Sequence, residues 1–418
     1  MKPSRHLPLA AALLSAAAVL AAPPAHADAG TSAGCRTTVA APDREQSRLR
    51  DPRTAALTDR AGLTTFTARF PAALCSVRNP VEAGQLMDSW GEALWQSAVG
   101  RAQGRRPGGD LAPGDDRPLY WTRVAMTAQL ASWQPGFPVD TSTLRARFED
   151  ASRGLTNNGF STTPGVRRVF ISGFDPFGLD GDIRTANPSG SAALRLNGRK
   201  VPLANGGTAE IRAVVLPVRY EDFDRGIVER AFGPRMAAGP RSADLITTIS
   251  QGYPGLFTLE AWAGRARSAD PYPDNQGALS GGSYDHPVDA PGLGPGAEFI
   301  ATTLPTDAMT AATQTPYPVL LNTQVSEIPA GQSEPVDLPD GPTPGSRAVA
   351  GGGGGYLSNE VAYRSNRLRL ELAPALPGGH LHTPVLTGLP SDRDRLTGPD
   401  FERNENEITA EILTILTS

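Results

Sequence analysis

The chain has 418 residues, of which 39% are hydrophobic, 20% charged and 6% aromatic, and its formal net charge is −4 at pH 7. This length suggests two or three domains with a large core. Nothing in the charge balance suggests a nucleic-acid partner, which favours a strongly basic face, and we expect none. The two cysteines are too few for a disulfide-dense miniprotein, an iron–sulfur protein or a zinc site built from cysteines.

Residues 1–27 have the features of a secretory signal peptide. A short basic start precedes an apolar run over residues 9–22, and a small-x-small cleavage site occupies residues 25–27. A membrane-spanning helix needs about 20 apolar residues, and Pro23-Pro24 end this run earlier. We therefore expect cleavage after Ala27 and a secreted, extracellular protein that has no stable membrane association.

An extracellular location favours a disulfide between Cys35 and Cys75. The loop between them would span about 40 residues, and the bond would stabilise the N-terminal region by about 4 kcal/mol in the chain-entropy model. A catalytic thiol is the alternative, but it needs a nearby base, and neither cysteine has a histidine close to it in the sequence.

Residues 28–160 are expected to form a small helical domain. Residues 28–78 are polar and are expected to be irregular, and Asn79-Pro80 then supplies an N-cap followed by proline at the first helical position. Apolar residues at spacings of three and four follow, and further helices are expected over residues 118–133 and 140–155. The aromatic residues of this part are expected in its core.

Residues 161–418 show a different pattern, in which apolar, β-branched runs alternate with helical segments. We expect strands at 168–173, 211–218, 244–250 and 319–322, and helices at 188–197, 221–232, 304–314, 360–372 and 400–416. Such alternation predicts an α/β sandwich with a mostly parallel twisted sheet. Ligands in these folds bind at the carboxyl ends of the strands, so the segments after each strand are the first candidates for a site.

Residues 324–355 are rich in proline and glycine and end in the run Gly351–Gly355. A phosphate-binding loop would need a lysine or a helix-opening Gly-x-Gly pattern, and this segment contains no lysine. We therefore expect a flexible surface insertion.

Short motifs after the expected strands form a specific set. In chain order they are Gly173-Phe174-Asp175-Pro176-Phe177-Gly178, Asn187-Pro188-Ser189, Leu216-Pro217-Val218, Ser250-Gln251-Gly252, Glu260, Pro273-Asp274-Asn275, Tyr356-Leu357-Ser358-Asn359 and His380-Leu381-His382-Thr383-Pro384. In this order they resemble pyroglutamyl peptidase I, also called pyrrolidone-carboxylate peptidase, over roughly residues 166–416. The resemblance implies a three-layer α/β/α sandwich, and a cofactor-free enzyme that removes N-terminal pyroglutamate from peptide substrates.

The resemblance also implies which residues form the site. Carried over by motif, the family's Glu–Cys–His triad falls on Glu260, Ser358 and His382, and its substrate pocket falls on Phe174, Phe177 and Gln251. The flat lactam ring has two apolar faces that aromatic rings can cover, and one N–H and one C=O for polar recognition. A nucleophile, a base and a group that orients the base are what amide hydrolysis requires, which gives a Ser–His–Glu arrangement here.

Two departures from the family's pattern define an alternative function. Ser358 stands where the family has cysteine, and serine is barely ionised at neutral pH, so it depends on His382 as its base. Pro271 stands where the family has an arginine that assists the oxyanion, and Arg265 and Arg267 are the nearby candidates to replace it. The alternative is a catalytically impaired protein that binds pyroglutamyl or other capped peptide ends without turnover.

Structural alternatives also remain for single residues. Glu260 could cap a helix or pair with an arginine, and the two phenylalanines could be ordinary core residues. His380 and His382 are two apart on an expected strand and so share one face. This spacing permits a metal pair, but after residue 27 the sequence has only one further histidine, His286, in a loop. We therefore expect no metal.

Overall fold

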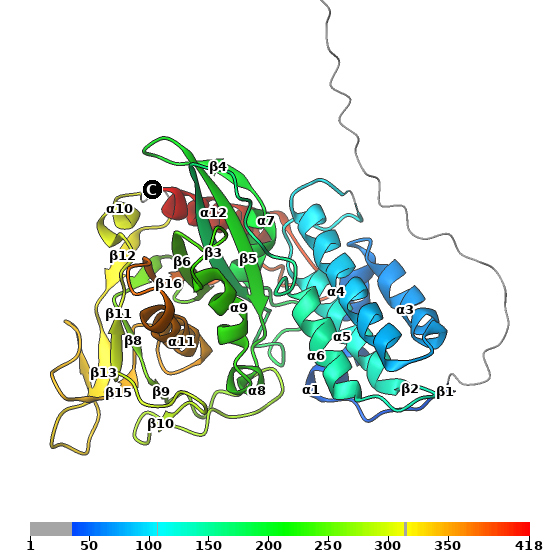
Figure 1. Ribbon diagram of the computed structural model, residues 1–418, viewed down its shortest axis with the longest axis horizontal. Coiled ribbons are helices and arrows are strands. Elements are labelled where there is room, and N and C mark those ends of the chain that lie inside the picture. The colour runs from blue at the N-terminus through cyan, green and yellow to red at the C-terminus, as the bar shows by residue number, and fades with distance from the viewer. Residues whose placement is uncertain (1–35, 107, 313–315) are drawn as a thin grey trace, which may run out of the picture. The chain divides into compact units, whose positions relative to one another are not determined.

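The computed structural model describes residues 36–106, 108–312 and 316–418 (Figure 1). The signal peptide, its cleavage after Ala27 and Cys35 lie outside these residues, so secretion and the disulfide stay predictions. Within the described ranges, no helix combines the length and the apolar character that crossing a membrane would require. Residues 34–418 form one compact unit, and the boundary expected at residues 160 and 161 also stays a prediction.

The N-terminal part is built from helices that share one apolar core. They are α1 (Arg44–Ser47), a 3-10 turn (Arg48–Arg50), α2 (Pro52–Asp59), α3 (Thr64–Ser76), α4 (Pro80–Ala102), α5 (Arg117–Ser132) and α6 (Thr141–Ser152), with a short ladder between β1 (Arg36–Thr37) and β2 (Trp133–Gln134). The expected N-cap is confirmed, since the Asn79 side chain accepts a hydrogen bond from the Glu82 N–H. Trp95 and Trp121 are buried, as expected for core residues.

The expectation that residues 28–78 are irregular is wrong from residue 44 onward. Helices α1 and α2 are short, and aspartates start both of them: Asp43 forms a capping box with Gln46, and Asp51 accepts from the Arg53 N–H. The apolar residues of this segment, such as Leu57 and Phe70, are fully buried. The short helices α1 and α2 lack the long periodic pattern from which helices are recognised, and in α3 the helix contains Pro71, a residue that normally indicates a helix break.

A seven-stranded sheet forms the centre of the second part. The strand order is β12 (Val319–Asn322), β7 (Phe257–Glu260), β16 (Gly378–Thr383), β6 (Leu245–Gln251), β3 (Val166–Phe174), β5 (Thr208–Leu216) and β4 (Lys200–Pro202). Four of the neighbouring pairs are parallel, and the pairs β7–β16 and β4–β5 are antiparallel. The four strands expected with bounds are confirmed, and β16 contains His380 and His382, which were expected on a strand, whereas β4 and β7 were not expected.

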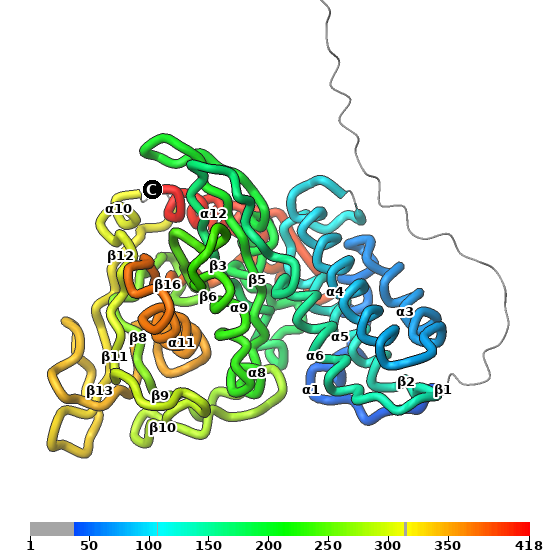
Figure 2. Tube along the Cα trace, viewed as in Figure 1, coloured from blue at the N-terminus to red at the C-terminus, as the bar shows by residue number. Residues whose placement is uncertain are grey.

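Helices cover both faces of this sheet (Figures 1 and 2). They are α7 (Pro188–Leu196) and α12 (Pro399–Thr417) on one face, and α9 (Ile227–Met236) and α11 (Leu357–Leu372) on the other, with α8 (Tyr220–Asp224) and α10 (Thr306–Ala311) between strands. Val169 and Ile171 of β3 belong to the apolar cluster of α7 and α12, and Phe170 belongs to that of α9 and α11. The alternation of side chains along β3 therefore confirms the three-layer α/β/α sandwich with a mostly parallel sheet.

Two expected elements differ from the observed ones. The helix expected at 221–232 is two helices, because Gly226 takes a left-handed conformation (φ 74°) between α8 and α9. Residues 324–355 are not an unstructured insertion: β13 (Val325–Ile328) pairs with β14 (Val336–Leu338) and β15 (Arg347–Ala350) in an antiparallel sheet. Two further ladders lie nearby, β8 (Trp262–Gly264) with β11 (Phe299–Ala301) and β9 (Ala266–Arg267) with β10 (Val288–Asp289).

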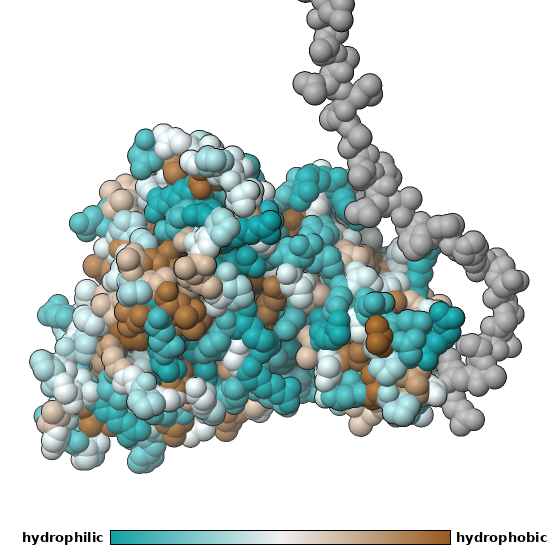
Figure 3. Space-filling model, viewed as in Figure 1, coloured by the Kyte–Doolittle hydropathy of each residue, from teal (hydrophilic) through white to brown (hydrophobic). Residues whose placement is uncertain are grey.

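Truncating a leucine inside the sandwich should be far more damaging than the same change on its surface. Leu194 of α7 is 1% exposed, whereas Leu370 lies 47% exposed on α11, where apolar atoms gather on the surface (Figure 3). We expect Leu194→Ala to lower the free energy of unfolding by about 2–5 kcal/mol and Leu370→Ala to lower it by less than about 1 kcal/mol. Urea unfolding of both variants measures this, and equal losses would contradict the described packing.

Candidate active site

A row of polar side chains crosses three neighbouring strands on the face of the sheet that α11 covers. The row consists of Thr248 and Ser250 of β6, His380 and His382 of β16, and Thr258 and Glu260 of β7, each directly paired across the register. Leu381, between the two histidines, belongs to the apolar cluster on the opposite face. The expectation that His380 and His382 share a face is confirmed, since their ring centroids lie 4.6 Å apart.

Glu260 and His382 form a buried hydrogen-bonded pair. Glu260 Oε1 lies 2.7 Å from His382 Nδ1, and the residues are 3% and 4% exposed. The Thr258 hydroxyl donates to Oε1 at 2.5 Å, and the Asn322 amide of β12 donates to Oε2 at 2.7 Å. These partners exclude the helix-cap and arginine-pair alternatives for Glu260. They also fix the imidazole so that its Nε2 faces away from the carboxylate.

The run Gly351–Gly355 packs directly against this pair. A Cβ atom on Gly352 would clash with the Glu260 carboxylate, and one on Gly351 would clash with the Asn359 side chain and the Gly264 backbone. The run is thus a close-packed cover of the site, and the expectation of a flexible segment is wrong here.

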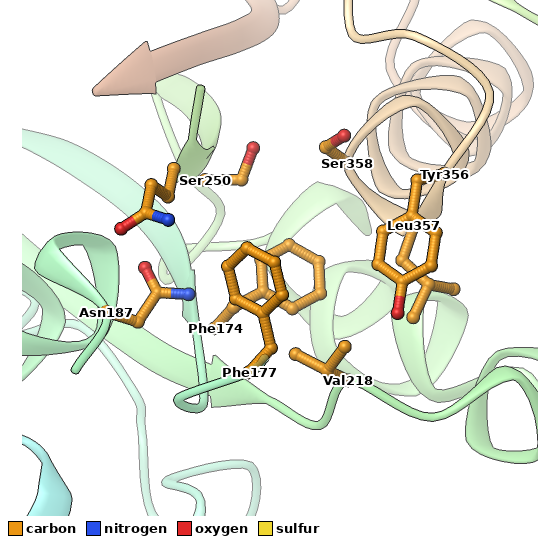
Figure 4. A pocket seen from close by; sticks show the side chains of 9 residues that line it. Phe174, Phe177, Asn187, Val218, Ser250, Tyr356, Leu357 and Ser358 are labelled. Carbon is orange, nitrogen blue, oxygen red and sulfur yellow. The ribbon is translucent and has the colours of Figure 1, made fainter. Parts of the chain in front are cut away.

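A small pocket lies where β3 and β6 end and α11 begins. Its volume is about 40 Å³, the space of a few water molecules at roughly 10–15 Å³ each. Its lining residues are Phe174, Phe177, Asn187, Val218, Ser250, Gln251, Tyr356, Leu357 and Ser358. The structure therefore brings together four residues that the motifs suggested: Phe174, Phe177, Gln251 and Ser358. Figure 4 shows the two phenyl rings between Asn187 and Val218, with the hydroxyls of Ser250 and Ser358 on one side of the rings.

Ser358 is not hydrogen-bonded to His382. Its hydroxyl donates to the Gly353 carbonyl at 2.8 Å, and no bond joins it to His382 among the interactions of the described residues. The structure thus assembles the Glu260–His382 half of the expected triad, next to a pocket that contains Ser358. The Ser358 hydroxyl donates its hydrogen bond to a backbone carbonyl and not to the histidine.

The two candidate replacements for the oxyanion arginine are engaged elsewhere. Arg267 forms ion pairs with Glu360 and Asp224, and Arg265 forms one with Asp289. Neither guanidinium lines the pocket. The family's arginine, whose position is Pro271 in this chain, assists the oxyanion, and neither Arg265 nor Arg267 takes over this role in the structure.

The remaining motif residues position the pocket loops. Asn187 caps α7 through Ser189 and donates to the Asp175 carbonyl at 3.1 Å. Asn275 donates its side-chain amide to the Pro176 carbonyl at 2.8 Å and its backbone N–H to the Val218 carbonyl at 3.0 Å. Asn275 therefore holds the loops after β3 and β5 together, the first through its side-chain amide and the second through its backbone N–H.

The N-terminal helices also hold the loop after β3. Asp175 is 2% exposed and accepts from Arg123 of α5 at 3.0 Å and from Arg153, which follows α6, at 2.6 Å. Arg219, after β5, pairs with Glu45 and Glu149 of the helical part. Both walls of the pocket are thus tied to the helices by buried ion pairs.

Breaking this buried charge cluster should cost more than breaking a surface pair. Asp175→Asn removes the charge that faces two buried guanidinium groups, and we expect the free energy of unfolding to fall by about 3–5 kcal/mol. The matched change Asp180→Asn removes ion pairs of a half-exposed aspartate with Arg44 and Arg48, and should cost less than about 1 kcal/mol. Denaturant unfolding compares the two, and a smaller loss for Asp175→Asn would argue against the cluster.

The environment of His380 perturbs its pKa. Burial, with a smaller contribution from His382, lowers its pKa well below the usual 6.5. Its Nδ1 lies 2.7 Å from the Thr248 hydroxyl and its Nε2 lies 2.8 Å from the Ser250 hydroxyl. Both ring nitrogens are therefore bonded, and the neutral imidazole is the favoured form.

The lowered pKa of His380 makes stability depend on pH. Below about pH 6.5 the unfolded chain binds a proton at this residue that the folded chain does not, so folding weakens as the pH falls. We expect the free energy of unfolding to drop by up to about 1.4 kcal/mol per pH unit there. His380→Gln should flatten this slope, whereas His286→Gln, at an exposed loop position, should leave the slope unchanged. An unchanged slope in His380→Gln would contradict the burial effect.

No metal site is apparent in the parts of the chain that the structure describes: no three His, Cys, Asp or Glu side chains there are grouped to hold an ion.

The fold and the site define an α/β/α protein with a buried carboxylate–histidine pair beside a small aromatic pocket. Residues 25–151 match the family model of the PA0049 N-terminal domain, and residues 168–288 and 307–387 match that of the PA0049 C-terminal domain. The PA0049 protein of Pseudomonas aeruginosa, described as uncharacterized, is 34% identical over an alignment of 423 residues that covers 79% of this chain and 76% of that protein. The chain therefore belongs to the PA0049 family.

Two solved peptidases are also similar to part of this chain. The pyrrolidone carboxyl peptidase of Thermococcus litoralis aligns with a TM-score of 0.39 and 18% identity, over 60% of this chain and 94% of that one. The pyroglutamyl peptidase I of Bacillus amyloliquefaciens aligns with a TM-score of 0.38 and 22% identity, over 60% of this chain and 95% of that one. At this level a superposition alone establishes neither a shared fold nor a shared activity, and the fold described above comes from the strands and helices of this chain.

Proposed function

We propose that this protein is a secreted exopeptidase-like hydrolase that removes N-terminal pyroglutamate from peptides. The observation that carries the proposal is the convergence of Phe174, Phe177, Gln251 and Ser358 on one pocket. Ser250, which lines the same pocket, is the register partner of His382. The pocket thus adjoins the Glu260–His382 pair, and the motif resemblance supplies the substrate class.

A five-membered lactam suits this pocket in size and chemistry. The phenyl rings can cover its apolar faces, and the Gln251 side chain, whose Oε1 accepts from the Leu386 N–H at 3.4 Å, has its Nε2 free to donate to the lactam carbonyl. An adjoining hollow of about 380 Å³ shares Phe177 and Tyr356 with the pocket. The residues that follow pyroglutamate would lie in this larger space.

The reaction needs a nucleophile, a base and an oxyanion site. His382 is the base in this proposal, Glu260 orients it, and Ser358 is the nucleophile that the motif indicates. For attack, the Ser358 hydroxyl would leave the Gly353 carbonyl and turn to His382. The first N–H groups of α11 start at Leu357 and would face the developing oxyanion, where a helix N-terminus favours negative charge.

The activity is tested with the mature chain and a fluorogenic pyroglutamyl amide. We expect release of the fluorophore, and a fall in kcat of about 10³–10⁴-fold in Glu260→Gln, because the base loses the group that orients it. Glu221→Gln, in a side chain that is 70% exposed, is the matched control and should keep full activity. No release by folded protein would refute the hydrolase.

Secretion has its own test. The supporting feature is the charged start, short apolar run and cleavage motif of residues 1–27. The protein recovered outside the producing cell should begin at Asp28 when its N-terminus is sequenced. An uncut chain that stays inside the cell would overturn this part of the proposal.

A binding protein without turnover is the second candidate. The Ser358 hydroxyl donates to a carbonyl instead of a base, and the two arginines nearest to Pro271 are paired elsewhere. In that case calorimetry should detect a pyroglutamyl dipeptide that is bound and not cleaved, and Ser358→Cys should gain hydrolysis because a thiolate is the stronger nucleophile. Absence of binding would refute this candidate.

A further inference from the structure

The pocket contains a second serine, and this one is hydrogen-bonded to a histidine. Ser250 lies near the carboxyl end of β6, and its Oγ is 2.8 Å from His380 Nε2. Ser250 is 4% exposed and His380 is 1% exposed, yet Ser250 lines the pocket beside Gln251 and Ser358. Neither Ser250 nor His380 has a role in the triad that the motif resemblance implies.

The hydrogen bonds of Thr248 are compatible with the His380 tautomer that a base needs. The Thr248 hydroxyl lies 3.3 Å from the Gly379 carbonyl and 2.7 Å from His380 Nδ1. With the ring proton on Nδ1, this hydroxyl accepts from the ring and donates to the Gly379 carbonyl. In that tautomer His380 Nε2 carries a lone pair, and the Ser250 hydroxyl, 2.8 Å away, donates to it.

The two serines of the pocket differ in this respect. The Ser358 hydroxyl is hydrogen-bonded to a carbonyl oxygen, which cannot take up its proton, whereas the Ser250 hydroxyl is hydrogen-bonded to an imidazole nitrogen, a group that can act as a base. Burial keeps His380 neutral by lowering its pKa, so the nitrogen is free to accept.

We propose that Ser250 is the hydroxyl that reacts in this pocket, with His380 as its base and Thr248 as a positioning residue. The inference deepens the proposed function and rests on it for the substrate class; it moves the nucleophile from Ser358 to Ser250. The Ser250 oxygen attacks the scissile carbonyl while its proton passes to His380 Nε2. The proton then passes to the leaving amine as the C–N bond breaks, and water hydrolyses the acyl-serine by the same route.

A carboxylate–histidine pair and a helix N-terminus lie beside Ser250 and His380. Glu260 is directly opposite His380 in the β7–β16 register, and its carboxylate is hydrogen-bonded to His382, whose ring centroid lies 4.6 Å from that of His380. The first turn of α11, with Leu357 and Ser358, lies across the pocket from Ser250 (Figure 4). A carbonyl between them would direct its oxygen towards the helix N-terminus.

The test is covalent labelling of the mature chain with an alkyl fluorophosphonate, which phosphonylates activated serine and releases fluoride. Peptide mass spectrometry then locates the label, and we expect it on Ser250. The labelling rate should fall by about 10²–10⁴-fold in His380→Gln. Ser250→Ala should remove the label, and its matched control, Ser89→Ala at an exposed serine of α4, should keep it. Thr248→Val should slow labelling and Thr248→Ser should restore it, which a purely structural role of Thr248 would not require.

The outcomes separate the inference from the proposed function. A label on Ser358, or on neither serine of the folded protein, overturns the inference, and hydrolysis of the pyroglutamyl amide in either case leaves the proposed function standing. A label on Ser250 without hydrolysis of that amide supports the inference and refutes pyroglutamate as the substrate.

Discussion

The burial of Asp175 between two arginines is the interaction on which the rest of the site depends. Asp175 lies in the chain between the pocket residues Phe174 and Phe177. Its carboxylate is buried and is bonded to Arg123 and Arg153 instead of to water. A buried charge is tolerated only with its partners in place. The helices that carry the arginines are therefore part of the pocket's construction, although none of their side chains lines it. This gives the N-terminal part a physical role that its own sequence does not reveal.

The strands that pattern analysis defined differ from β7, which it missed, in the length of their apolar run. Strands β3 and β5 are mostly apolar, which is the pattern of a central parallel strand. Strand β6 carries Thr248 and Ser250 of the polar row but still has Leu245, Ile246 and Ile249. Strand β7 has only four residues, and two of them, Thr258 and Glu260, belong to the polar row. So short a strand leaves no apolar run from which it can be recognised.

The motifs located the Glu260–His382 pair and much of the pocket lining, but not the hydrogen bonds of the serines. Ser250 and His380 are 130 residues apart in the chain, and only the parallel register of β6 with β16 brings them together. Likewise, the direction of the Ser358 hydroxyl depends on a carbonyl of the glycine run, which composition suggested was flexible. The motifs identify which residues belong to the site, whereas the strand register determines which of their side chains form hydrogen bonds with one another.

The glycine run that covers Glu260 has a consequence for how the site assembles. Glycine loses more conformational entropy on folding than any other residue, so ordering residues 351–355 is expensive for the chain. The run has few side-chain contacts of its own to offset this cost, and it is held between Glu260, Ser268 and Asn359. Its ordering is therefore coupled to that of β7 and α11, which provide the groups it packs against. The segment that covers the carboxylate–histidine pair thus depends on the rest of the site for its own conformation.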